Sequence, residues 1–188
     1  RLANIAAGIV VGKSGTASPS LAELSISLNA VDSVLSKNEV KDLVKEAKQD
    51  SKKIVFTNGC FDLLHVGHIT YLEEAKKLGD RLVVALNSDT SVRKLKGAKR
   101  PINKLKDRAK QIAALDCVDW VTSFTEDTPL KLIKELEPDV LVKGKDYKVK
   151  DIAGSKEVLF KGGEVKTIKL VKGVSTSNLI KKIKDLDS

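Results

Sequence analysis

Residues 54–68, IVFTNGCFDLLHVGH, form the stretch of this sequence that decides the fold. The apolar run at 54–57 is typical of a buried β-strand, and a helical pattern begins at residue 67 after a polar loop. Free amides and the positive end of the helix dipole favour phosphate at such a helix start, and Gly67 leaves room for close approach. His65 and His68 add two imidazoles there. The stretch therefore predicts an anion site where a strand runs into a helix.

Strands and helices alternate along the rest of the chain. Short apolar runs predict strands at residues 54–57, 82–86, 118–121, 140–142 and 165–168. Helical patterns lie between and after them, at residues 67–78, 103–115, 129–137, 155–161 and 176–186. This alternation predicts an α/β fold with a parallel five-stranded sheet flanked by helices, and a ligand site beyond the carboxyl ends of the strands.

The region before the first strand differs in composition. Residues 1–35 are rich in Ala, Gly and Ser, whereas Ser36 and Glu39 have capping-box spacing and predict the start of a helix. We expect a linker helix over 36–51 and a main domain over 52–188. The apolar face of this helix either buries against a second copy of the chain, which would give a homo-oligomer, or covers the chain's own sheet.

Polar and basic side chains follow two more of the predicted strands. Asn87 and Asp89 come after the second strand and lead to a basic segment with Lys96 and Arg100. Such a segment is either a solvated loop or a set of phosphate ligands. The fourth strand is followed by another set of candidates: Lys143, Gly144 and Asp146.

The last predicted helix begins with hydroxyl side chains. Ser175 and Thr176 stand at its start, where hydroxyls and free amides either cap the helix or hold a phosphate. The residues alone leave both interpretations open.

Charge and composition narrow the class of partner. The chain carries 34 basic and 25 acidic residues, which favours anionic ligands. Aromatic residues make up only 4%, so stacking surfaces for single-stranded nucleic acid are scarce, and a phosphate-bearing small molecule is favoured. No apolar run approaches the roughly 20 residues that span a bilayer, and the start of the sequence lacks the order of a secretory signal. We expect a cytoplasmic protein without a membrane partner.

Cysteine and histidine are too few for a metal site. Cys60 and Cys117 are flanked by apolar residues, and we expect them to be small buried side chains, not a disulfide. His65 and His68 are the only histidines, so zinc would lack a complete ligand set. We therefore predict no metal-ligating side chains.

The segment from 65 to 68, HVGH, resembles the HxGH signature of the cytidylyltransferase-like nucleotidyltransferase superfamily. The resemblance implies a Rossmann-like fold in which His65 and His68 contact a triphosphate and stabilise the transition state. It implies that the strand-end segment approaches the nucleotide, at Thr57, Asn58, Gly59, Cys60 and Phe61. The stretch GVSTSN at 173–178 resembles the family's carboxy-terminal Ser/Thr motif, which implies distal-phosphate contacts from Ser175, Thr176 and Ser177.

Five stretches together resemble D-glycero-β-D-manno-heptose 1-phosphate adenylyltransferase domains, over about residues 53–184. They are residues 56–68, 85–97, 100–102, 138–144 and 151–165. The resemblance implies ATP as donor and a heptose 1-phosphate as acceptor, with Lys96 and Lys143 between the charged partners. Lys145 departs from the family pattern, where we expect glycine, and this departure puts the conformation of the loop in question.

Residues 1–35 resemble the end of a ribokinase-like kinase, and we expect them to be its remnant, without sugar kinase activity. A P-loop is suggested at residues 8–14, but only three residues separate Gly8 from Gly12 where that motif needs four. We assign this segment no nucleotide role.

The expected reaction joins ATP and the heptose 1-phosphate into ADP-heptose and pyrophosphate, for lipopolysaccharide core precursors, with Mg²⁺ bridging the phosphates. The acceptor phosphate is a competent nucleophile near neutral pH, so no general base is required. Two alternatives stay open: CTP-dependent transfer to a polyol phosphate such as glycerol 3-phosphate, and a non-catalytic nucleotide or RNA binder.

Overall fold

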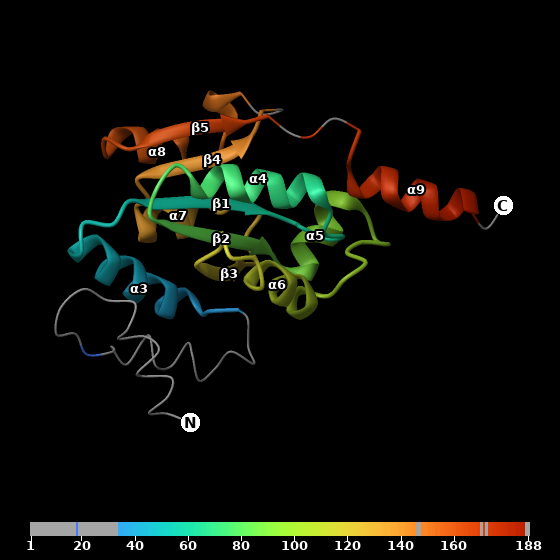
Figure 1. Ribbon diagram of the computed structural model, residues 1–188, viewed down its shortest axis with the longest axis horizontal. Helices are drawn as coiled ribbons and strands as arrows, with labels where there is room; N and C mark the ends of the chain where they lie inside the picture. Colours follow the sequence, from blue (N-terminus) through green and yellow to red (C-terminus); the bar gives the residue numbers. More distant parts are fainter. Residues whose placement is uncertain (1–17, 19–33, 146–147, 170, 172, 187–188) are drawn as a thin grey trace.

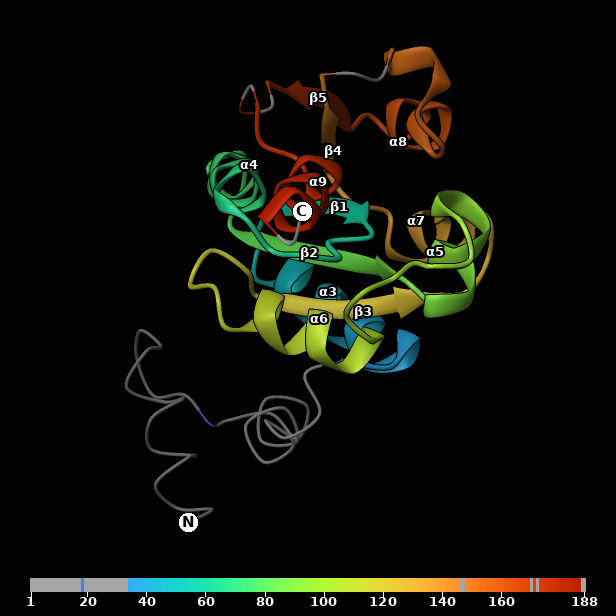
Figure 2. The same cartoon turned by 90° about the vertical axis from the view of Figure 1, so that its right-hand side faces the viewer.

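In the computed structural model of the chain, five parallel strands form one sheet in the order β3-β2-β1-β4-β5. The structure describes residues 18, 34–145, 148–169, 171 and 173–186. Figure 1 shows helices on both faces of the sheet, and Figure 2, viewed towards the carboxyl ends of the strands, places α4 on one side and α7 and α8 on the other. The predicted α/β class with a Rossmann-like parallel sheet is confirmed.

All five predicted strands are present, as β1 Ile54–Gly59, β2 Arg81–Asn87, β3 Trp120–Phe124, β4 Val140–Gly144 and β5 Glu164–Ile168. The prediction for β3 was wrong in its bounds, because the strand runs from 120 to 124 and not from 118 to 121. Val118 is buried as expected of a strand residue, but its amide donates to the Leu115 carbonyl in the preceding turn.

Helices α4 Val66–Lys76, α6 Leu105–Ala113, α7 Leu130–Leu136 and α8 Ser155–Phe160 lie within two residues of their predicted bounds, and α9 Thr176–Leu186 has the predicted ones. A short 3₁₀ helix, η1 Val149–Asp151, precedes α8. Helix α5 Asp89–Lys96 was not predicted, since its basic residues were taken for a strand-end segment. The Ser88 hydroxyl caps α5 by accepting from the Ser91 amide at 3.2 Å.

The two faces of the sheet carry separate apolar cores. Alternate residues of β1 point to opposite faces, so Phe56 packs with α3, α7 and α8, whereas Val55 packs with α4 and α6. Helix α9 buries none of its residues and projects from the carboxyl-end side of the sheet (Figure 1). Strands β1, β2 and β4 and helix α4, which carry candidate residues, are thus anchored in these cores, whereas α9 is not.

Helix α3 Lys37–Gln49 begins with the predicted capping box: the Ser36 hydroxyl accepts from the Glu39 amide at 3.2 Å, and the Glu39 carboxylate accepts from the Ser36 amide at 2.8 Å. Its apolar face, with Val40, Val44 and Ala47, packs on the chain's own sheet. The sequence left open whether this face packs on a second copy of the chain or on the chain's own sheet, and in the structure it packs on the chain's own sheet. Leu35, just before the helix, pairs with Thr122 at the edge of β3.

The predicted kinase remnant lies almost wholly outside the described residues, and the division of the chain at residues 35 and 51 stays a prediction. Among the helices that the structure describes, none is both long and apolar enough to cross a bilayer.

Candidate functional site

Many of the candidate residues lie at or just after the carboxyl ends of β1, β2 and β4, the edge that the sequence predicted. β1 ends at Gly59, and a short loop leads from there into α4 at Val66. β2 ends at Asn87 and leads directly into α5. Because β1 pairs with both β2 and β4, these strand ends are neighbours.

His65 and His68 form a stacked pair at the start of α4. Their ring centroids lie 3.7 Å apart with the planes inclined by 14°, and the Phe61 ring lies 5.1 Å from that of His68. His65 is the N-cap of α4, since its Nδ1 accepts from the His68 amide at 3.3 Å. A neutral imidazole that accepts at Nδ1 carries its proton on Nε2. His65 is therefore arranged to donate a hydrogen bond from Nε2.

The surroundings of the pair favour uncharged rings. Burial lowers the pKa of His65. Burial, and then the charge of His65, lower the pKa of His68 to about 4, while a backbone hydrogen bond to Leu63 acts in the opposite direction. His68 Nδ1 is buried and has no hydrogen-bond partner among the described residues. A phosphate beside the rings would raise both pKa values, because negative charge favours imidazolium.

Two glycines make room for rings of the site. A Cβ on Gly67 would lie 3.1 Å from Nδ1 and 3.2 Å from Cε1 of His65, and a Cβ on Gly59 would lie 2.9 Å from the Phe61 ring. The sequence attributed Gly67 to the close approach of a phosphate, whereas in the structure its lack of a side chain leaves space for His65.

Asp62, which was not predicted as a site residue, fixes the loop before α6. Its buried carboxylate accepts from the amides of Ile102, at 2.8 Å, and Asn103, at 2.9 Å, and from Arg100 Nε, at 2.5 Å. Burial alone would raise the pKa of Asp62, but these donors outweigh it and lower the pKa. Arg100, predicted as a phosphate ligand, is thus paired with Asp62 through Nε.

Arg108 on α6 was also missed, and it is fully buried beside the site. Its guanidinium donates to three carbonyls and to the Asp89 carboxylate, at 2.8 Å. The carbonyls belong to Cys60, at 2.6 Å, Asn87, at 2.9 Å, and Asn103, at 3.1 Å. A signal was available, because residues 105, 108, 109 and 112 have helical spacing and put this arginine on the apolar face.

The side chains of two predicted nucleotide-binding residues are engaged within the protein. The Thr57 hydroxyl is fully buried, 2.7 Å from the Tyr71 hydroxyl and 3.1 Å from the Val142 carbonyl. Asn87 is buried and its Nδ2 donates to the Ser91 hydroxyl at 3.0 Å. At these two positions the backbone is the part left for a ligand.

Lys143 and Gly144 lie at the end of β4, where Lys143 Nζ donates to the Asn58 carbonyl at 3.0 Å. Lys96 is exposed at the end of α5. Lys145 is exposed, and its amide donates to the Ile168 carbonyl at 2.8 Å, so lysine is accommodated where glycine was expected. Asp146 lies outside the described residues.

The segment before α9 comes close to the start of α4 at one residue, Val171. A Cβ on Gly67 would lie 3.8 Å from Val171 Cβ. The Ser175 hydroxyl accepts from the Asn178 amide at 3.1 Å, as a cap does, while Thr176 is half-buried and Ser177 exposed. Helix capping is therefore observed, and phosphate binding stays a prediction.

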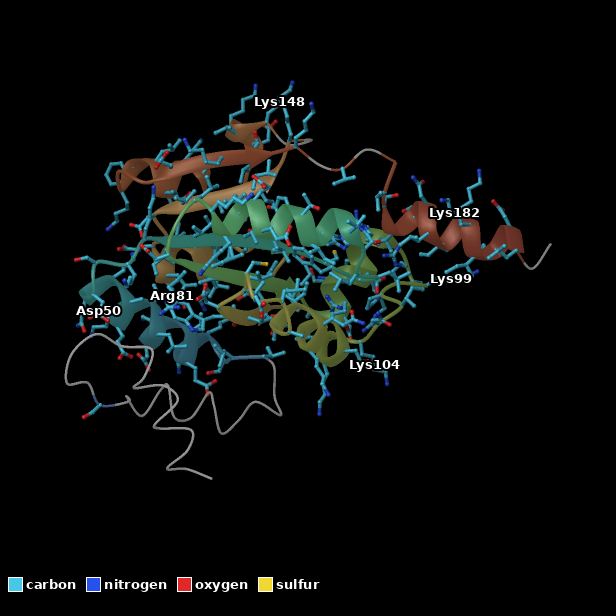
Figure 3. All side chains as sticks on the ribbon, in the orientation of Figure 1. Asp50, Arg81, Lys99, Lys104, Lys148 and Lys182 are labelled. Carbon is cyan, nitrogen blue, oxygen red and sulfur yellow. The ribbon has the colours of Figure 1, made fainter. Side chains whose placement is uncertain are left out.

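Both cysteines are free and half-buried, and Cys117 packs against the apolar core that contains Val55, so burial is only partial where small buried side chains were expected. Burial raises the pKa of the Cys60 thiol, although Lys96, Arg108 and Arg100 act to lower it. Asp62 acts in the opposite direction, and Arg100 and Arg108 are already paired with the carboxylates of Asp62 and Asp89. Figure 3 shows Lys99 and Lys182 at the same end of the molecule.

A family model described as cytidylyltransferase-like matches residues 56–182. The bifunctional protein HldE of Haemophilus influenzae (strain PittEE) is 57% identical over 187 residues, which cover 97% of this chain and 39% of that protein. HldE of Actinobacillus succinogenes is 55% identical over 189 residues, which cover 98% of this chain and 40% of that protein. The chain thus spans about two fifths of the length of these relatives.

A solved structure, described as the lipopolysaccharide core biosynthesis protein from Thermoplasma volcanium GSS1, is 34% identical with a TM-score of 0.54. The match covers 65% of this chain and 99% of that one.

Proposed function

This chain belongs to the cytidylyltransferase-like family, and we propose that it is an adenylyltransferase that joins ATP and D-glycero-β-D-manno-heptose 1-phosphate into ADP-heptose and pyrophosphate. The observation that carries the proposal is the stacked pair of His65 and His68 at the start of a helix, inside the segment that the family model matches. The proposed use of ADP-heptose is the synthesis of lipopolysaccharide core precursors. The description of the 34% identical structure supports this use.

In the proposed reaction, an oxygen of the sugar phosphate attacks the α-phosphorus of ATP in line. A new P–O bond forms there, and the bond from the α-phosphorus to the bridging oxygen breaks, with its electron pair leaving on pyrophosphate. Catalysis consists of positioning and charge stabilisation. His65 would donate from Nε2, and His68 would gain positive charge as the triphosphate raises its pKa.

Cationic and hydroxyl groups would hold the remaining phosphates. Lys96 is exposed near the strand ends, and Lys143 already donates to the loop after β1. We propose that these lysines neutralise charge between the partners and that Ser175, Thr176 and Ser177 contact the distal phosphates. The proposed nucleotide contacts of Gly144 and Asp146 rest on the family resemblance.

Magnesium would enter with the triphosphate. It prefers oxygen ligands, and the carboxylates of Asp62 and Asp89 at this edge are already paired with arginines. These paired carboxylates do not fit a resident magnesium site, so the phosphate oxygens of the nucleotide would supply the magnesium ligands. Magnesium would neutralise developing charge on the phosphates.

The relatives are called bifunctional, and this chain spans about two fifths of them. We propose that it corresponds to their nucleotidyl-transfer part and that sugar kinase activity belongs to the rest. A cytoplasmic location follows from the proposed use of ATP.

The test is pyrophosphate release from the chain with Mg²⁺, either ATP or CTP, and either the heptose 1-phosphate or glycerol 3-phosphate. We expect release with ATP and the heptose phosphate. Release confined to CTP and glycerol 3-phosphate would replace the proposal with the cytidylyltransferase alternative, and no release from any pair would indicate a binding protein.

A further inference from the structure

Arg108 is a fully buried arginine that joins four segments of the candidate site. It lies on α6, and its acceptors are the Cys60 carbonyl after β1, the Asn87 carbonyl at the end of β2, the Asp89 carboxylate on α5, and the Asn103 carbonyl before α6. We propose that Arg108 is a positioning residue that holds the ends of β1 and β2 and the first turn of α5 in the geometry that binds the nucleotide. We call Arg108 and its four partners the Arg108 clasp; the partners are Cys60, Asn87, Asp89 and Asn103.

The chemistry of arginine fits this role. A guanidinium presents its donors in a rigid planar fork, so several acceptors in fixed directions are held at once. Burying a charge is costly unless it is paired and hydrogen-bonded, and Arg108 has both an ion pair, with Asp89, and carbonyl acceptors. The arrangement is stable only while all four segments stay in place, because each supplies one of the acceptors.

A second buried ion pair extends the clasp to the loop before α6. Asp62 accepts from the Asn103 amide, whose own carbonyl accepts from Arg108. Asp62 lies in the same loop as Cys60, three residues before His65. The histidine loop, the end of β2 and the loop that carries Arg100 are thereby joined through two charged side chains that do not face solvent.

The clasp controls groups that a nucleotide would meet. The Asp89 side chain is 29% exposed, so Arg108 holds one of its oxygens while part of the side chain stays accessible to solvent. The backbone at residues 59–61 is held in place by the hydrogen bond from Arg108 to the Cys60 carbonyl. This inference rests on the proposed function, which makes these strand ends the nucleotide side of the site.

The test compares Arg108→Lys with the parent chain. Lysine keeps the charge but has a single ammonium, which cannot reproduce the fork. Arg81→Lys is the matched control, because Arg81 Nη1 pairs with Asp119 at 2.8 Å, and Figure 3 shows Arg81 at the opposite end of the molecule. The measurements are KM for each substrate, kcat, cooperative unfolding, and hydrogen exchange of the ligand-free chains.

With Arg108→Lys we expect KM for ATP to rise and kcat to fall, so that kcat/KM for ATP drops about 100-fold. KM for the sugar phosphate should stay unchanged. Amides of residues 59–62 and 87–91 should exchange about tenfold faster, since hydrogen bonds to a charged group are lost. Arg81→Lys should change none of these quantities. Reduced stability with parental KM and kcat would overturn the inference and leave Arg108 a structural residue.

Two further outcomes of the experiment have to be distinguished: a variant that does not fold, and a parent chain without activity. If Arg108→Lys does not fold, Asp89→Asn removes the charged partner instead, and the same acceleration of exchange is expected at residues 59–62 and 87–91. If the parent chain releases no pyrophosphate, the proposed function fails, whereas exchange in the variants still decides on the clasp. Unchanged hydrogen exchange in both Arg108→Lys and Asp89→Asn would overturn the inference.

Discussion

The ring of His65 lies flat against the ring of His68, with centroids 3.7 Å apart, and the first of these residues caps the helix that carries the second. Two imidazoles this close disfavour a double positive charge. Because Nδ1 of His65 accepts from the His68 amide, a proton added at that nitrogen would break the N-cap hydrogen bond of α4.

The low pKa of His68 predicts a pH effect on stability. In the unfolded chain the imidazole titrates near its ordinary value of 6.5, but in the folded chain it stays neutral down to about 4. Between these values the unfolded state binds more protons, so the free energy of unfolding should fall as the pH falls. Urea unfolding across this window should show a steeper fall for the parent chain than for His68→Gln. Coincident pH curves would show that His68 titrates normally.

Gly67→Ala should lower turnover without unfolding the chain. Alanine in a helix is normally more favourable than glycine by about 1 kcal/mol, so the helix itself should tolerate it. The added Cβ would lie 3.1 Å from His65 Nδ1 and push the ring from its stack. The contrast is Gly79→Ala, whose Cβ would lie 2.8 Å from the Lys53 carbonyl oxygen, away from the histidines. Thermal unfolding and pyrophosphate release should distinguish the two variants: Gly67→Ala should lose turnover, whereas Gly79→Ala should lose stability. Parental turnover in Gly67→Ala would show that the ring position does not matter.

Asp62→Asn should destabilise the fold by about 3–5 kcal/mol, since it removes one partner of a buried ion pair. Asp127→Asn is the control, because the pair of Asp127 with Lys94 is exposed and should contribute less than about 1 kcal/mol. Denaturant unfolding measures both. Equal, small losses in the two variants would mean that Arg100 and Asp62 contribute no more than a surface pair.

Ser36→Ala should lower the free energy of unfolding by about 1 kcal/mol, through loss of the α3 cap, and leave KM and kcat unchanged. Lys104→Ala is the control for this loss of stability, because Lys104 is the N-cap of α6 but its side chain makes no capping hydrogen bond that the substitution could remove. A change of KM on Ser36→Ala would connect α3 to the site in a way the structure does not show.

Much of this fold was predictable because its signals are local. The apolar run of β1, the capping box of Ser36 and the hydroxyl start of α9 each depend on residues within one element. Helix α5 escaped prediction because only Ser91 and Val92 are buried in it and its other side chains are mostly charged. The start of β3 was misplaced because an apolar residue, Val118, belongs to a turn.

The site was predictable in its location but not in its internal bonds. Parallel alternation placed the candidates at one edge, and HVGH marked the helix start. Asp62 binds residues 40 and 41 positions away, and Arg108 binds Cys60 across 48 positions. Such pairs have no local pattern, because they depend on where the sheet brings distant loops together. The roles proposed for the histidines stay predictions.

The most direct measurement is pyrophosphate release with Mg²⁺, ATP and D-glycero-β-D-manno-heptose 1-phosphate, by the parent chain and by His68→Ala. We predict that the parent chain releases pyrophosphate and forms ADP-heptose, and that the variant, still folding cooperatively, loses about 100- to 1,000-fold in turnover. No release by the parent chain, or near-parental turnover by His68→Ala, would contradict nucleotidyl transfer at this histidine pair.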